Sequence, residues 1–227
     1  MKVCLVTSHE INQAWSEKLD KICSNDLLVF SFNGLGLVSY KKELNGQTEY
    51  FSDLAKLSRQ LSCTIVCGCD TDTYGVFRRS CVVADKGKIL GVSDMVYSID
   101  DSEFVPGGAV RVYETSAGRI GVIVSKDLFF PETIKTLALC DADLLCCVYK
   151  KIENFMPEIL TRAWAFTSGI STCICAENYA CVSDIRGNIV SKSTMDIVKT
   201  QVKIEKDYHL IKCKRRGFFK EDGLYKE

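Results

Sequence analysis

The stretch Gly118-Arg-Ile-Gly-Val-Ile-Val-Ser-Lys-Asp-Leu-Phe-Phe-Pro-Glu132 is the part of this chain that decides its fold. Residues 120–124 form a short apolar run rich in β-branched side chains, which predicts a buried strand. Ser125 then begins a sharp turn. Pro131 and Glu132 suit the first turn of a helix, where proline is tolerated and a carboxylate meets the positive end of the helix dipole. A side chain between a buried strand and a helix N-terminus is well placed for a nucleophile, and here it is Ser125.

Outward from this stretch, strand-like and helix-like segments alternate without a linker, which indicates one domain over residues 1–227. Tight turns at 85–88 and 116–118 predict hairpins and therefore a mixed sheet. We expect a glycine-punctuated loop at 34–46, and Ser52 or Asp53 as the N-cap of a helix at 50–61. The other helices are expected at 12–24, 132–139 and 155–168, and strands at 3–7, 26–32, 64–70, 76–84, 88–94, 110–114, 119–124, 143–148, 171–176 and 197–204.

Composition places the chain among ordinary globular proteins. Its 227 residues are 47% hydrophobic and 26% charged, enough for a substantial core. A formal net charge of zero gives no support for attraction to nucleic acid or to an anionic membrane surface. No run reaches the roughly 18 to 20 apolar residues that cross a bilayer, and the opening apolar run is too short for a signal peptide. We therefore expect a cytoplasmic protein.

The thirteen cysteines invite a metal or disulfide interpretation. Most lie in apolar, strand-like runs, where free cysteine behaves as a small buried hydrophobe. Cys67 and Cys69 would share one strand face, as would Cys173 and Cys175, which could suit a soft metal. The chain has no Cys-x-x-Cys and only two histidines. We favour core packing over redox sensing and over metal binding, and we expect no metal and no cofactor.

The segment 118–132 resembles the signature of the nitrilase, or carbon–nitrogen hydrolase, superfamily, in which a cysteine is followed by an aromatic residue, an acid and later Phe-Pro-Glu. This resemblance implies an α/β fold with mixed sheets, a four-layer α-β-β-α sandwich. It also implies a glutamate base after an apolar strand and a lysine that stabilises the oxyanion. The stretches that match are Asp26-Leu-Leu-Val-Phe-Ser-Phe32 and Leu90-Gly-Val-Ser-Asp-Met95. The three catalytic positions therefore hold Phe32, Met95 and Ser125.

These three residues predict a family member without the Glu/Lys/Cys constellation. A serine hydroxyl needs an adjacent base, and Phe32 cannot accept a proton. Met95 offers no N–H to an oxyanion, and losing one such donor typically costs about 10²- to 10³-fold in rate. A ring and a thioether would make the cavity apolar or fill it. We therefore predict a pseudoenzyme that acts by binding a ligand or a partner, with no intact catalytic residues.

Two alternatives stay open. Glu103 begins Glu103-Phe-Val-Pro-Gly107, which resembles a family segment whose glutamate serves as an auxiliary acid. With Ser125 it would make an altered hydrolase or acyltransferase, although a loop glutamate is more often solvated. The other alternative is a regulatory subunit associated with an active paralogue. A small apolar ligand in the residual cavity is a further reading.

The C-terminal segment 205–227 carries the basic cluster Lys212-Cys-Lys-Arg-Arg216. A solvated tail is one interpretation, and the lack of interleaved aromatic residues in that cluster argues against nucleic acid. The apolar pairs Phe218-Phe219 and Leu224-Tyr225 would be hard to leave exposed. The resemblance implies a homodimer built from such tails and from the helix that contains Arg162-Ala-Trp-Ala. We therefore expect the tail to contact a second subunit.

Overall fold

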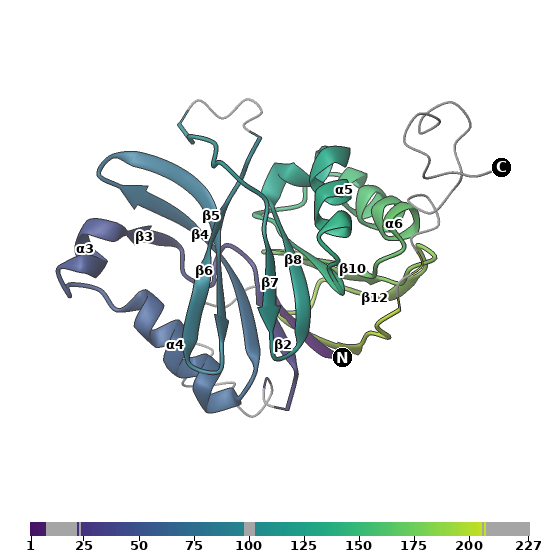
Figure 1. The fold of residues 1–227 in the computed structure, drawn as a ribbon, viewed down its shortest axis with the longest axis horizontal. Helices are drawn as coiled ribbons and strands as arrows, with labels where there is room; N and C mark the ends of the chain where they lie inside the picture. The colour runs from purple at the N-terminus through teal and green to yellow at the C-terminus, as the bar shows by residue number, and fades with distance from the viewer. Residues whose placement is uncertain (8–21, 23, 98–102, 206, 208–227) are drawn as a thin grey trace, which may run out of the picture.

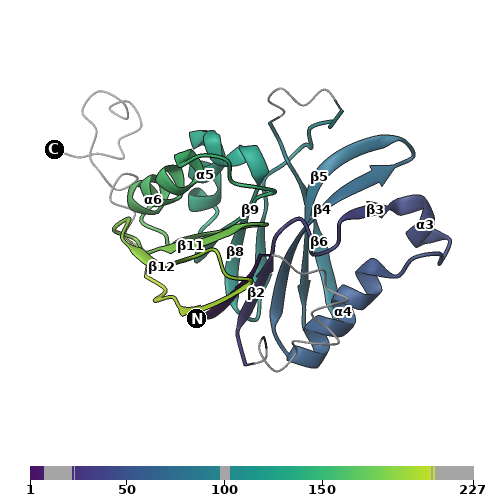
Figure 2. The same cartoon turned by 180° about the vertical axis from the view of Figure 1, so that it is seen from behind.

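The fold places two β-sheets face to face and covers each outer surface with helices (Figures 1 and 2). The computed structural model describes residues 1–7, 22, 24–97, 103–205 and 207. The expected α/β sandwich of four layers, α-β-β-α, is confirmed. Most of the predicted helix 12–24 and nearly all of the tail 205–227 lie outside the described residues.

The first sheet has seven strands in the order β13-β1-β2-β4-β5-β6, with β3 paired to the far end of β4. β1, β2 and β4 run parallel, whereas β4, β5 and β6 form an antiparallel meander that contains the predicted hairpin turn at 85–88. α3 (Tyr40–Leu44) and α4 (Tyr50–Leu61) lie against its outer face. The strands are β1 Lys2–Val6, β2 Leu27–Phe30, β3 Leu37–Ser39, β4 Thr64–Thr73, β5 Val76–Asp85, β6 Lys88–Asp94 and β13 Ile197–Gln201.

The second sheet has six strands in the order β12-β11-β10-β9-β8-β7. Its parallel centre, β8, β9 and β10, is linked by crossovers through α5 (Pro131–Leu139) and α6 (Met156–Ser168). No helix in the described part of the chain is long and apolar enough to span a bilayer. The strands are β7 Val112–Thr115, β8 Gly118–Val124, β9 Leu144–Val148, β10 Thr172–Ala176, β11 Tyr179–Ser183 and β12 Ile189–Ser193.

Alternation along the strands divides the apolar residues into three layers. In β9, Leu144, Cys146 and Val148 face the first sheet, whereas Leu145 and Cys147 face α5 and α6. Because both faces of such a strand are covered, its sequence is apolar without interruption. The layer between the sheets, called the inter-sheet core below, includes Val3, Leu5, Leu27, Val29, Val66, Val83, Val122, Val124, Cys173, Cys175 and Val182.

The described cysteines are buried except Cys140, which supports their interpretation as packing residues. As predicted, Cys67 and Cys69 share one strand face, towards α4, and Cys173 and Cys175 share another, towards the first sheet. Burial raises the pKa of the Cys4 thiol to about 12, although Lys199 opposes the shift. A buried thiol with so high a pKa is protonated at neutral pH and unreactive as a nucleophile.

Two local predictions in the first half of the chain were wrong. The expected loop at 34–46 contains β3 and α3. The N-cap of α4 is Glu49, not Ser52 or Asp53, and its side chain makes no capping bond. Instead, the Glu43 carboxylate at the end of α3 accepts the Tyr50 and Phe51 amides at 3.1 and 3.3 Å. The first amides of α4 are therefore capped by a carboxylate seven residues before Tyr50, and not by Ser52 or Asp53 as we predicted.

The two sheets approach each other closely at Gly68 of β4. A Cβ there would lie 2.4 Å from Val148 Cγ1 and 3.1 Å from the backbone nitrogen and Cα of Phe32. We expect Gly68→Ala to lower the free energy of unfolding by about 1–3 kcal/mol, because backbone and a packed strand must move apart. Urea unfolding measures this change. Gly108→Ala is the matched control, since its Cβ would meet open space; equal midpoints for the two variants would contradict the prediction.

Candidate functional site

Ser125 lies in a strained turn at the end of β8. Its φ is +51°, in the left-handed region that non-glycine residues adopt only at a cost of about 1–3 kcal/mol. A 3₁₀ helix, Ser125–Phe129, follows, and α5 begins at Pro131 as predicted. From α6, Trp164 Nε1 donates a hydrogen bond of 2.8 Å to the Leu128 carbonyl and fixes the turn. Ser125 is only 4% exposed, so the turn is formed but its serine is hardly accessible to solvent.

Phe32 follows β2, at the neighbouring end of the first sheet. The residue before it, Ser31, is anchored by its hydroxyl to the Thr7 carbonyl at 2.8 Å. The Phe32 backbone lies against Gly68, whose other neighbour is Val148. The side chain is 3% exposed and belongs to the inter-sheet core. Phe32 is therefore a packing residue of that core.

Met95 follows β6 and belongs to the same apolar cluster. Its amide donates to the Arg79 carbonyl at 2.8 Å, and its carbonyl accepts from the Gly107 amide at 2.7 Å. The side chain is 2% exposed and lies in the inter-sheet core with Phe32. Two positions expected to face Ser125 thus present apolar side chains inside the protein.

The structure brings these segments to one end of the sandwich. Val148, beside Gly68 and Phe32, pairs in register with Val124, the residue before Ser125. Asp127, two residues after Ser125, accepts hydrogen bonds from the amides of Val96 and Tyr97, which follow Met95. The three positions named from the sequence therefore converge, although they lie 30 or more residues apart in the chain.

Asp127 is a site residue to which our sequence analysis gave no role. It is 1% exposed, and its Oδ1 accepts from Val96 at 3.0 Å and from Tyr97 at 2.9 Å, while Oδ2 accepts from Val96 at 2.9 Å. Burial raises the pKa of its carboxyl to about 6, and the two amides oppose the shift. The rings of Tyr97 and Phe130 stack beside it with centroids 3.8 Å apart. The sequence did contain a signal for Asp127, because the family signature has an acid shortly after the nucleophile position.

Glu103 lies in a different environment from Ser125. Glu103 is exposed, and the next residue, Phe104, bridges to Phe77 of β5 with the Arg79 guanidinium 4.3 Å above its ring. An exposed carboxylate and a buried hydroxyl do not form a preorganised base–nucleophile pair. Within the described ranges, no group of three or more His, Cys, Asp and Glu side chains could hold a metal ion.

The buried Asp127 carboxyl makes stability depend on pH. Its folded pKa of about 6 exceeds the unfolded value of about 4, so the folded state binds more protons between these pH values. Stability contributed by the protonated form is complete below pH 4 and is lost as pH rises through 6. The wild type should therefore lose about 3 kcal/mol of its free energy of unfolding as the pH rises from 4 to above 6. We expect Asp127→Asn, which keeps an acceptor oxygen but cannot ionise, to lack this loss.

Urea unfolding at pH 4 and pH 7 measures this effect. The difference in the free energy of unfolding between the wild type and Asp127→Asn should change between these two pH values. Asp127→Ala is the comparison variant. It leaves the Val96 and Tyr97 amides without their acceptor and should lower stability at both pH values by about 1–3 kcal/mol. A wild-type chain with the same pH dependence as Asp127→Asn would contradict the raised pKa.

Several solved structures share this architecture. A carbon–nitrogen hydrolase from Helicobacter pylori G27 aligns with a TM-score of 0.75 over 96% of this chain and 97% of that chain, at 16% identity. The NitN amidase from Nesterenkonia sp. AN1 aligns with 0.74 over 95% and 96%, at 18% identity. Nit3 of Saccharomyces cerevisiae, from branch 10 of the nitrilase superfamily, aligns with 0.70 over 88% and 89%, at 18% identity. At such identities these likenesses show the fold.

Sequence comparison identifies the family. The chain is 28% identical over 136 residues to a Schizosaccharomyces pombe protein named as a probable nitrilase, covering 56% of this chain and 50% of that protein. The chain thus spans about half the length of this curated relative. The family model described as carbon-nitrogen hydrolase matches residues 24–204, most of the chain. This chain therefore belongs to the carbon–nitrogen hydrolase family.

Proposed function

We propose that this chain is a catalytically inactive member of its family that acts by binding a ligand or a partner. The observation that carries this proposal is the burial of Phe32 and Met95, which are 3% and 2% exposed and pack in the inter-sheet core. By the family resemblance, these positions would hold the general base and the oxyanion lysine. An aromatic ring and a thioether supply neither function.

The groups around Ser125 support the same proposal. A serine attacks a carbonyl only when a base takes its proton. Asp127 is the buried carboxylate nearest in sequence, but both of its oxygens accept backbone amides of the segment after Met95. Its structural role, joining two segments, leaves it poorly suited to proton transfer.

The alternative is an altered hydrolase or acyltransferase that uses Ser125 with Glu103. The strained φ of +51° at Ser125 favours it, because strained backbone is concentrated at functional sites. The exposure of Glu103 and the burial of Ser125 weigh against it. We therefore keep it as the second candidate.

We expect the purified chain to release no ammonia from short aliphatic amides or nitriles above the level of its Ser125→Ala variant, because base and oxyanion donor are both absent from their positions. A coupled ammonia assay at micromolar protein measures this. Turnover by the wild type that Ser125→Ala abolishes would refute the inactive reading. Loss of that turnover in Glu103→Gln would then establish the alternative.

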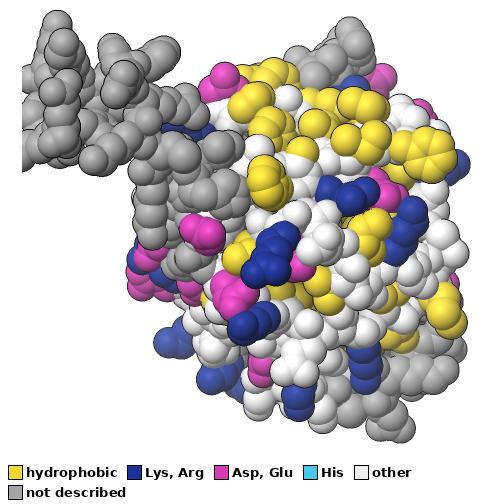
Figure 3. Space-filling model, turned by 90° about the vertical axis from the view of Figure 1, so that its right-hand side faces the viewer, with side chains coloured by type: hydrophobic (Ala, Val, Ile, Leu, Met, Phe, Trp, Pro, Cys, Tyr) yellow, Lys and Arg dark blue, Asp and Glu magenta, His cyan; other side chains and the backbone are white. Residues whose placement is uncertain are grey.

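We also propose that the chain forms a homodimer through α6. Phe155, Ile159 and Phe166 are 78%, 51% and 51% exposed, and their spacing of four and seven residues places them on one helical face. Leu139, at the end of the neighbouring α5, is 62% exposed. Apolar side chains gather on the upper part of this side of the molecule (Figure 3). A second copy of the same face would bury them in an isologous contact.

Analytical ultracentrifugation at micromolar concentration tests this contact. We expect a dimer for the wild type and a monomer for Ile159→Glu and Phe166→Glu, since a buried unpaired carboxylate is strongly unfavourable. Leu90→Glu, at an exposed apolar position on β6, should remain dimeric. A wild-type monomer would refute the homodimer, and its recovery in complex with an active paralogue would assign the face to that partner.

A further inference from the structure

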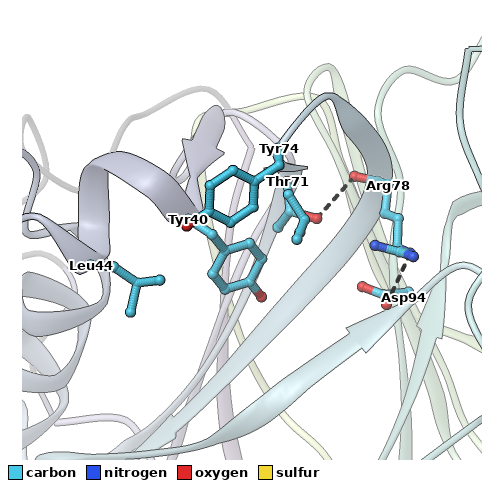
Figure 4. A pocket seen from close by; sticks show the side chains of 7 residues that line it. Tyr40, Leu44, Thr71, Tyr74, Arg78 and Asp94 are labelled. Atoms are coloured by element: carbon cyan, nitrogen blue, oxygen red, sulfur yellow. Dashed lines mark hydrogen bonds and ion pairs between the residues drawn. The ribbon is translucent and has the colours of Figure 1, made fainter.

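A cavity lies on the opposite face of the first sheet from Phe32 and Met95. It has a volume of about 300 Å³, at the lower end of the range for small-molecule sites. Its lining comes from α3, from the turn between β4 and β5, and from the outer ends of β4, β5 and β6 (Figure 4). The residues are Tyr40, Leu44, Thr71, Thr73, Tyr74, Arg78 and Asp94.

The sheet changes character where this cavity begins. On the face towards α4, β4 presents Ile65, Cys67 and Cys69, all fully buried and apolar. The same face continues with Thr71, and its cross-strand neighbours are polar too. In register, Thr71 pairs with Arg78, and Ser80 pairs with Asp94. Beyond the end of α4 the floor is therefore polar on three adjacent strands, although a core would require apolar residues there.

A chain of buried hydroxyls holds Asp94 in place. Thr71 Oγ1 and Ser80 Oγ are 2.9 Å apart, and both residues are at most 1% exposed. Ser80 Oγ donates to Asp94 Oδ1 at 2.7 Å. With Oδ1 engaged, Oδ2 is the oxygen on the side of Arg78, at 3.8 Å from its Nε. At 3.8 Å the two groups form an ion pair but not a direct hydrogen bond, so Arg78 Nε–H and Asp94 Oδ2 do not use up each other's hydrogen-bonding capacity.

The other end of the cavity is apolar. Leu44 is 75% exposed and Tyr74 is 71% exposed, and both line the cavity. The Tyr40 ring lies between them and the charged pair (Figure 4), and Phe51 of α4 fixes it with ring centroids 5.8 Å apart. Large apolar side chains exposed around a concave polar floor are typical of a ligand site.

We propose that this cavity binds a zwitterionic α-amino acid with an apolar or aromatic side chain. The carboxylate would bind the Arg78 guanidinium and the ammonium group would bind Asp94 Oδ2. A ligand with one charge would satisfy one member of the pair and be repelled by the other, whereas adjacent opposite charges on one carbon satisfy both. The side chain would lie among Leu44, Tyr40 and Tyr74. This proposal does not depend on whether Ser125 is catalytic.

Calorimetric titration of the full chain with three probes tests the assignment. L-Phenylalanine carries both charges, L-phenylalaninamide lacks the carboxylate, and 3-phenylpropionate lacks the ammonium group. We expect L-phenylalanine to bind at least tenfold more tightly than either of the others, since each lost charged hydrogen bond is worth a tenfold change or more. No binding of L-phenylalanine, or equal binding of 3-phenylpropionate, overturns the proposal.

Variants locate the binding. Arg78→Gln and Asp94→Asn should each weaken L-phenylalanine binding tenfold or more, and Arg186→Gln, on the exposed turn between β11 and β12, should leave it unchanged. Tyr74→Asn is a variant that should fold normally, because Tyr74 is exposed and has a φ of +53°, a conformation that asparagine tolerates. It should weaken L-phenylalanine binding and leave the unfolding midpoint unaltered. Binding that survives Arg78→Gln and Tyr74→Asn would overturn the site.

Discussion

The apolar interior shared by the two sheets is the constraint on which the rest of this structure depends. Every central strand must place alternate side chains in that layer, and β4 must approach β9 so closely that Gly68 has no room for a side chain. Phe32 and Met95 belong to the same layer. A carboxylate at position 32 or an ammonium at position 95 would place a charge inside this packed apolar layer.

Asp127 couples the two halves of the sandwich through a single carboxylate. It follows β8 in the second sheet and binds amides that follow β6 in the first. This structural role does not depend on whether Ser125 is catalytic. The strained turn at Ser125 and the helix start at Pro131 flank Asp127 in the same segment.

Sequence periodicity predicted most of the strands, the main helices and the hairpins at 85–88 and 116–118, because apolar alternation and tight turns are local properties. Helix 50–61 has the predicted ends, since its apolar face lies within one stretch of sequence. The cap from Glu43 could not be predicted, because it requires knowing that α3 folds back on α4. The cavity at Arg78 and Asp94 could not be predicted either, because its residues come together only through the register of β5 and β6. Phe32, Met95 and Ser125 were named as one site only because of the family resemblance.

Burial protects the thiols of this fold from oxidants and thiol reagents. Cysteines such as Cys146 and Cys175 are fully buried with pKa values well above the ordinary thiol range, so reagents that need a thiolate cannot act on them in the folded chain. Global unfolding exposes at once the ten sulfurs that are buried in the described part of the chain, with ordinary reactivity. The lifetime of the protein under oxidising conditions is therefore set by how rarely it opens, and thiol capture becomes a direct reporter of that opening rate.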